Sequence, residues 1–282
     1  MLRRDRGALA GALLFAAVVL AALFAGALTP YDPLAIRMQD RLQPPSARHL
    51  LGTDELGRDL LSRILHGGRA SLSVGVVAVG IAATAGTAMG LVAGYYGGAL
   101  AAVIMRTVDG LLAFPALILA MALTATLGPS LTNAAVAIGI VTIPAFARLA
   151  QASALAIKER EFTDAARACG AGDLYVLVRV LLPNHVSPLM VQTSVSFANA
   201  ILTEAALSFL GLGIQPPTPS WGAMLDTGRR YLDQTAWYSM AAGGAILIAV
   251  LGLNLLGDGL RDALDPRLRG ARAARLAEEP SG

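Results

Sequence analysis

The sequence has few charged or aromatic residues and almost no cysteine. Only 15% of its 282 residues are charged and 5% are aromatic, and the net charge is +3. The basic residues are scattered between apolar runs, whereas a nucleic-acid interface needs them gathered into a patch. Because Cys169 is the single cysteine, an intrachain disulfide framework and a multi-cysteine metal site are both excluded.

Several motifs of catalysis and metal binding are also absent. The single lysine, Lys158, lies between Ile157 and Glu159, so the chain has no P-loop for nucleotide hydrolysis. Its three histidines are scattered and form neither a His-Glu-x-x-His pair nor a metal cluster. No serine lies in a Gly-x-Ser-x-Gly elbow. We therefore expect a protein that is not an enzyme and that has no catalytic residue, metal ligand or cofactor of its own.

What the sequence has in excess is apolar side chains. Hydrophobic residues make up 55%, and with the 30 glycines the apolar share is about 66%, against about 45–50% in soluble domains. A soluble protein could not bury that much apolar surface, since folding buries at most about three quarters of what the chain exposes. Disordered chains are poor in apolar residues, so disorder is excluded as well. We predict an all-α membrane protein.

Uncharged runs long enough to cross about 30 Å of hydrocarbon, which takes about 20 helical residues, locate the spans. Two runs of 36 and 38 residues are too long for one helix, and turn signals at 94–98 and 128–130 divide them. Residues 205–225 are uncharged too, but three prolines crowd their second half. We predict a short interfacial or re-entrant helix at 205–210, then an external loop. The six predicted transmembrane helices are 7–31, 71–93, 100–127, 131–151, 180–203 and 234–257.

The distribution of basic residues predicts the orientation. With both termini in the cytoplasm, thirteen arginines and lysines lie inside and eight outside, and a seventh span would place the five arginines of the tail outside. The basic N-terminus and the apolar run after it also resemble a cleavable signal peptide. The apolar core, residues 8–24, is longer than the usual 7–15 residues, so we expect an uncleaved first span.

The segment 158–184, between the fourth and fifth spans, predicts two helices around a glycine corner. The first covers 161–169, and the second covers 174–182 and runs into Pro183. Gly170 and Gly172 can take a positive φ, and Asp173 can cap the second helix. The first helix has a small-residue face, formed by Ala165 and Ala166, which could enter a groove of another protein. The alternative is a solvated amphipathic hairpin without a partner.

The sequence Asp164-Ala165-Ala166, then Gly170, then Leu182-Pro183 resembles the signature loop of a known family, the ABC importer permeases. The family usually has glutamate where this chain has Asp164. Many relatives have a histidine where this chain has Val180. Three further segments are similar to the second permease of dipeptide, oligopeptide and nickel importers, and together they cover the chain from about residue 30 to 269. These segments are 51–63, 209–222 and 254–266.

The resemblance implies a MetI-like permease fold with six transmembrane helices and a cytoplasmic coupling helix that docks into a separate ATPase subunit. The implied division is an N-terminal helix and external loop (1–70), a permease core (71–260) and a cytoplasmic tail (261–282). Substrate-binding residues are not assigned by the resemblance. The residues implied to couple to the ATPase are Asp164, Ala165, Ala166, Gly170 and Asp173.

The implied partners are a homologous second permease, two ATP-binding-cassette ATPase subunits that hold ATP and Mg²⁺, and an extracytoplasmic substrate-binding protein. The implied location is the bacterial cytoplasmic (inner) membrane. Dipeptides or short oligopeptides are the expected substrates, with nickel chelates, glutathione and opines as alternatives. An ion-driven secondary transporter would belong to a different class. It should show internal repeats or paired ionisable residues at mid-membrane, and the sequence shows neither.

Four further features predict local structure. Residues 56–65 have the spacing of an amphipathic helix, which would begin at Thr53 or Asp54 and end at Gly67-Gly68. It would rest on the membrane surface or form part of a docking surface for the external binding protein. Small residues in the second span predict close helix contacts. The remaining predictions are a structural pair of Arg106 with Asp109, a capping or gate-packing role for Glu204, and close contacts at Gly75, Gly80, Gly86 and Gly90.

Overall fold

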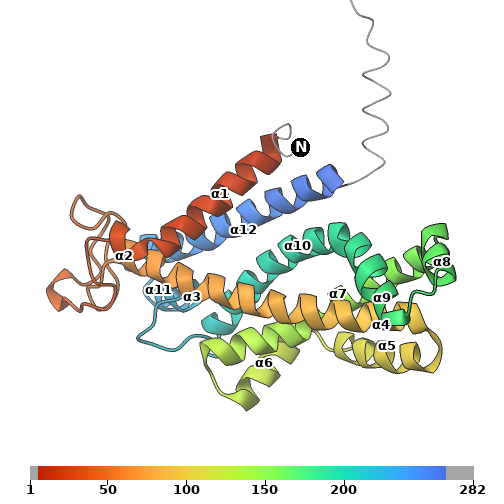
Figure 1. The fold of residues 1–282 in the computed structure, drawn as a ribbon. Helices are drawn as coiled ribbons and strands as arrows, with labels where there is room; N and C mark the ends of the chain where they lie inside the picture. Colours follow the sequence, from red (N-terminus) through yellow and green to blue (C-terminus); the bar gives the residue numbers. More distant parts are fainter. Residues whose placement is uncertain (1–5, 265–282) are drawn as a thin grey trace, which may run out of the picture.

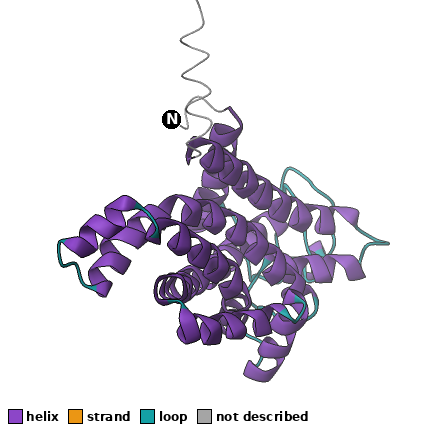
Figure 2. Cartoon of the chain, turned by 90° about the vertical axis from the view of Figure 1, so that its right-hand side faces the viewer, coloured by secondary structure: helices purple, strands orange, loops and turns teal. Residues whose placement is uncertain are grey.

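The structure, a computed structural model, describes residues 6–264. Its regular elements are helices, and no strand occurs within this range (Figure 2). The apolar composition is consistent with this result, since a helix satisfies its own backbone hydrogen bonds within a membrane. The predicted all-α class is therefore confirmed.

Four helical segments of the described chain are long and apolar enough to cross a membrane. Two of them contain a π-helical turn, Ala82–Gly86 between α3 and α4 and Val176–Leu181 between α9 and α10. The four are Leu60–Tyr96 (α3, Leu60–Ile81, with α4, Thr87–Tyr96), Leu131–Lys158 (α7), Asp173–Phe209 (α9, Asp173–Tyr175, with α10, Leu182–Phe209) and Ala236–Ala263 within α12 (Ala236–Leu264).

Two other predicted spans have a different form. Helices α5 (Gly98–Leu112) and α6 (Ala116–Leu127) qualify only together, because a bend of 91° separates them. This break at Pro115 was not predicted, although the helical conformation is disfavoured at a residue that precedes proline. Helix α1 (Arg6–Leu23) is apolar but shorter than the four spans. Each of the six predicted spans thus corresponds to an apolar helix or helix pair.

Glycines 67 and 68 do not end a helix, so that prediction was wrong. Helix α3 begins at Leu60, capped by the Asp59 side chain rather than by Thr53 or Asp54, and continues through both glycines. A Cβ atom on Gly68 would lie 3.0 Å from the Trp221 ring and 3.2 Å from the Ala22 Cβ. The glycine therefore serves close packing against two neighbouring elements and does not form a turn.

Two other predicted boundaries were also wrong. The second helix of the 158–184 segment does not stop at residue 182, because the π-helical turn Val176–Leu181 leads directly into α10. The wider π-helical turn accommodates Pro183, which has no N–H to donate. Residues 205–210 are not a separate helix either, since α10 continues to Phe209 and turns at Gly211, with φ of 78°. The predicted external loop holds a helix of 10 residues, α11 (Trp221–Arg230), capped by the Ser220 side chain.

The long helices lie side by side and carry different structures at their two ends (Figure 1). Helices α1 and α12 run together, and a Cβ on Gly11 would lie 2.6 Å from the Leu255 Cβ. One end, which we call the 30–59 end, carries the segment 30–59 and helix α11. The short helix α2 (Ala25–Leu28) precedes this segment, and the short helix η2 (Met38–Asp40) lies within it. The opposite, 158–184 end carries α8 (Glu161–Ala168), α9 and the turn between α4 and α5.

Helix α4 packs against α7 through its glycines. A Cβ on Gly90 would lie 2.2 Å from the Ala147 carbonyl oxygen, and one on Gly94 would lie 2.5 Å from the Ala154 Cβ. Gly86 faces α7 in the same way, and Gly75 faces the Phe197 ring of α10. A Cβ on Gly80 would meet no heavy atom within 4 Å, so close contact is confirmed at three of the four predicted glycines.

Candidate functional site

The 158–184 segment contains two short helices, α8 and α9, and lies at one end of the bundle (Figure 1). Helix α7 ends at Lys158, and α8 follows after a turn of two residues. The buried Thr163 hydroxyl donates to the Ile157 carbonyl oxygen at 2.8 Å, which fixes α8 to the end of α7. The predicted helix over 161–169 is therefore present and ends one residue earlier.

The predicted small-residue face of α8 is accessible. Asp164 and Ala165 are exposed and Ala166 is half-buried. Gly170 turns the chain with φ of 84° and is also exposed. Larger apolar side chains of the segment are exposed as well, and exposed apolar surface is typical of a contact with another protein or with a membrane. These side chains are Phe162, Leu174, Tyr175 and Val178.

Two details of the predicted corner were wrong. Gly172 has φ of −72°, so only Gly170 uses the left-handed conformation. Asp173 is the first residue of α9 and does not cap it, since the N-cap position belongs to Gly172. The Asp173 carboxylate instead accepts a hydrogen bond from the Tyr95 hydroxyl at 2.7 Å.

Tyr95, near the end of α4, is the residue of this site that the sequence analysis missed. The Lys158 ammonium donates to the Tyr95 carbonyl oxygen at 2.7 Å, and the Arg167 guanidinium lies 5.3 Å from the centre of the Tyr95 ring. Asp173 is 78 residues away in the sequence, so no local spacing could indicate the contact. The only nearby signal, the glycine-rich break at 94–98, marked a helix end.

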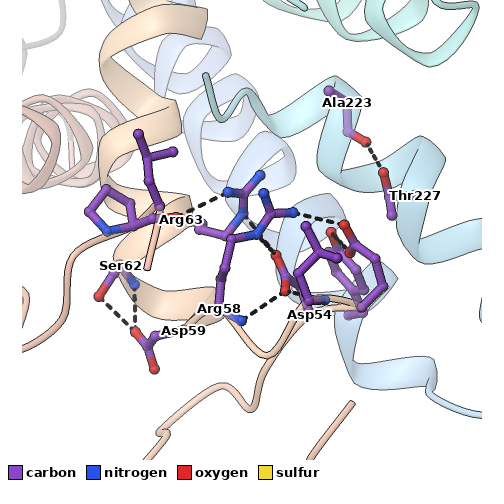
Figure 3. Close-up of polar contacts among 12 residues, drawn as sticks. Asp54, Arg58, Asp59, Ser62, Arg63, Ala223 and Thr227 are labelled. Carbon is purple, nitrogen blue, oxygen red and sulfur yellow. Dashed lines mark hydrogen bonds and ion pairs between the residues drawn. The ribbon is translucent and has the colours of Figure 1, made fainter. Parts of the chain in front are cut away.

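The 30–59 end holds a buried ion-pair cluster, which we define as Asp54, Glu55, Arg58 and Arg63 (Figure 3). The fully buried Asp54 carboxylate lies 2.6 Å from the Arg58 Nε and 3.2 Å from the Arg63 Nε. Glu55 pairs with Arg58 at 2.8 Å and accepts from the Tyr238 hydroxyl at 3.2 Å. The cluster thus joins the segment before α3 to α3 itself and to α12.

A second buried group lies beside this cluster. His49 Nδ1 is 2.9 Å from Asp59 Oδ1. Asp59 Oδ2 accepts from the Ser62 backbone amide and hydroxyl, both at 2.8 Å (Figure 3). Residues 56–65 therefore do not form one amphipathic helix, since those before Leu60 belong to a folded, polar loop. Whether this loop touches an external binding protein stays a prediction.

The two predicted sites within the spans differ from expectation. Asp109 pairs with Arg148 of α7 at 2.7 Å and not with Arg106, so it links α5 to α7. Glu204 is fully buried inside α10, five residues before its end, and accepts from the Ser208 hydroxyl at 2.7 Å. It does not cap the helix end, and its role in gate packing stays a prediction. No group of three His, Cys, Asp or Glu that could hold a metal ion occurs within residues 6–264.

Comparison with known families gives two matches, which together cover most of the chain. Residues 86–270 match the family described as "binding-protein-dependent transport system inner membrane component". Residues 1–45 match the "N-terminal TM domain of oligopeptide transport permease C".

Comparison with individual proteins agrees with these families. The chain is 48% identical to the di/tripeptide transport system permease protein DppC of Pseudomonas aeruginosa, over 95% of this chain and 90% of that protein. It is 43% identical to the probable D,D-dipeptide transport system permease protein of Escherichia coli, over 97% and 92%. It is 45% identical to the glutathione transport system permease protein of Pectobacterium atrosepticum, over 94% and 89%.

A solved structure shares the fold. An inward-facing structure of the MetNI methionine ABC transporter contains a chain that superposes with a TM-score of 0.59 and covers 72% of this chain and 96% of its own length. The sequence identity is 18%, so the likeness concerns the fold, which is the MetI-like arrangement of helices.

Proposed function

Because this chain belongs to the family of binding-protein-dependent transport system inner membrane components, we propose that it is the permease of an ATP-driven importer of dipeptides or short oligopeptides. The named relatives with 42–48% identity support peptides over nickel chelates and opines, since their names specify dipeptides, di/tripeptides or glutathione, itself a tripeptide. Substrate arrives on an extracytoplasmic binding protein and passes along a path shared with a homologous second permease.

The 158–184 segment is the contact with the motor in this proposal. Two separate ATPase subunits hold ATP and Mg²⁺, and each permease presents one projecting helix to one ATPase. The observation that carries the assignment is the exposed small face of α8, next to the exposed Gly170 corner, at the 158–184 end. Ala165 and Ala166 let the helix sit deep in a groove, and Asp164 and Asp173 border the contact. Closure of the ATPases then biases the bundle through this contact.

The same proposal sets the orientation in the bacterial cytoplasmic membrane. The 158–184 end faces the cytoplasm, where ATP is, together with both chain termini, and the 30–59 end faces the exterior. The predicted excess of basic residues on the inner side supports this orientation. Arg267, Arg269, Arg272 and Arg275, which contribute to that excess, lie outside the described residues.

The test places bulk on the small face. Ala166→Trp adds a bulky side chain to the face of α8 that would enter the ATPase groove, so the helix should no longer fit there. The ATPase subunit should then fail to co-purify, and substrate-stimulated ATP hydrolysis should fall about tenfold or more. Gly170→Pro should have the same effect, because proline cannot adopt the positive φ of that corner. Ala47→Trp makes the same change at an exposed site of the 30–59 end and should leave ATPase binding intact.

Unchanged ATPase binding and stimulation in both variants would contradict the assignment. A second result would contradict the whole proposal. Membrane vesicles that contain only this polypeptide should not accumulate peptide without nucleotide, and accumulation there would indicate an ion-driven secondary transporter.

A further inference from the structure

Tyr95 is a buried side chain at the 158–184 end. It is 6% exposed, while the neighbouring Tyr96 is 49% exposed. Its ring belongs to a small apolar cluster that joins three different elements, which are α4, α7 and the π-helical turn Val176–Leu181. The buried members of this cluster are Leu91, Tyr95, Ala150, Ala154, Val176 and Leu181.

The polar contacts of Tyr95 reach both ends of the projecting segment. Lys158, where the segment leaves α7, donates to the Tyr95 carbonyl oxygen at 2.7 Å. Asp173, where the segment returns to the bundle, accepts from the Tyr95 hydroxyl at 2.7 Å. Arg167, on α8, lies over the ring. One residue of α4 therefore contacts the end of α7, helix α8 and the first residue of α9.

The elements that Tyr95 connects are themselves tightly held. Helix α4 lies against α7 at backbone distance, because Gly90 and Gly94 leave no space for a side chain between them. The first residue of α9, Asp173, is continuous through the π-helical turn with α10. The hydrogen bond from Tyr95 to Asp173 therefore links the α4–α7 pair to the α9–α10 span.

We propose that Tyr95 is a positioning residue for energy coupling, and that its hydroxyl holds Asp173 so that a displacement of α8 moves α10 together with the α4–α7 pair. This inference rests on the proposed function, because it assumes that α8 receives the movement of the ATPase. A hydrogen bond to a carboxylate is short and directional, and about twice as strong as one between neutral groups. The apolar contacts around the ring pack the same elements but fix no direction between them.

Tyr95→Phe tests the inference because it removes one oxygen and keeps the ring, its packing and the position of the ring under the Arg167 guanidinium. The assay uses the complete complex of both permeases, both ATPases and binding protein in proteoliposomes. It measures the number of peptides imported per ATP hydrolysed. We expect this ratio to fall about five- to tenfold, which is within the range of coupling between linked sites. The amount of complex recovered should equal that of the unmodified protein.

Asp173→Asn provides a second measurement that does not depend on the first variant. The amide keeps an acceptor oxygen and loses the charge, so the ratio should fall less than in Tyr95→Phe. If the two groups act through one hydrogen bond, the double variant should be no worse than Tyr95→Phe alone. Tyr231→Phe is the matched control, since that ring lies 5.7 Å below the Arg41 guanidinium at the opposite end, and it should keep the unmodified ratio.

The outcomes separate this inference from the proposed function. If import requires ATP and Tyr95→Phe keeps the unmodified ratio, the inference is wrong and the proposed function stands. A purely structural role would lower the yield of complex and leave the ratio unchanged, which also overturns the inference. If the unmodified complex imports peptide without ATP, the proposed function itself is wrong.

Discussion

The two ends of the bundle are anchored in different ways. At the 30–59 end, charged groups are buried and paired, and both α3 and α11 begin with a side-chain cap, from Asp59 and Ser220. At the 158–184 end, α8 and α9 begin without a side-chain cap, and the pair of Asp164 with Arg167 is exposed and 3.7 Å long. The first end is held by buried ion pairs and side-chain caps, whereas α8 at the second end has neither.

One chain therefore combines a rigid surface at the 30–59 end with a more adaptable one at the 158–184 end. A buried ion pair tolerates little movement, because a charge that loses its partner away from water is strongly destabilising. An exposed pair contributes little and can rearrange at little cost. Segments with few buried contacts open most readily, and such segments are the ones that move when a partner binds. The 158–184 end has the properties of the moving part.

The largest effect should come from the centre of the ion-pair cluster. Asp54→Ala leaves Arg58 and Arg63 buried without their shared carboxylate, which should lower the free energy of unfolding by about 3–5 kcal/mol. Denaturant unfolding of the purified chain in detergent, followed by tryptophan fluorescence, measures this change. Asp164→Ala removes a carboxylate whose side chain is 71% exposed and should change the free energy by less than about 1 kcal/mol. Equal effects at the two sites would remove the contrast between the ends.

An intermediate effect is expected where α4 packs against α7. Gly90→Ala places a Cβ within 2.2 Å of the Ala147 carbonyl oxygen, so the helices must separate, at a cost of about 1–3 kcal/mol in unfolding free energy. Gly80→Ala, in the same continuous span, meets no atom within 4 Å and should leave stability unchanged or slightly higher. If both variants unfolded like the original chain, α4 and α7 would not form the tight pair that supports Tyr95.

The smallest effect should come from adding a cap where the structure has none. Arg160 is the N-cap of α8 and has the extended backbone, with φ of −85° and ψ of 141°, that a capping side chain requires. Arg160→Ser should therefore slow hydrogen exchange of the first α8 amides about two- to fivefold, which corresponds to about 0.5–1 kcal/mol. Ser130→Ala removes the existing cap of α7 and should change exchange there in the opposite direction. Unaltered exchange in α8 would show that its start is already held by other contacts.

The spans were predictable from the sequence because the hydrocarbon of a membrane excludes charge over a fixed length. The helix over 161–169 and the turn at Gly170 were predictable as well, since both follow from local patterns. Gly68 was misread because glycine serves both turns and close packing, and only the position of Trp221 distinguishes the two uses. The partners of Tyr95 and Asp109 lie 78 and 39 residues away, and contacts over such separations are set by the fold.

The bend between α5 and α6 has a consequence for how this chain is solvated. Each helix end leaves up to four backbone groups without an intrahelical partner, and here Pro115 supplies neither an N–H nor a side-chain cap. Lipid tails cannot satisfy such groups. Yet Leu112 and Phe114 are exposed in the single chain, so the corner must be wetted or covered by another polypeptide. In the importer proposed above, the second permease would cover this corner and so separate its backbone groups from lipid.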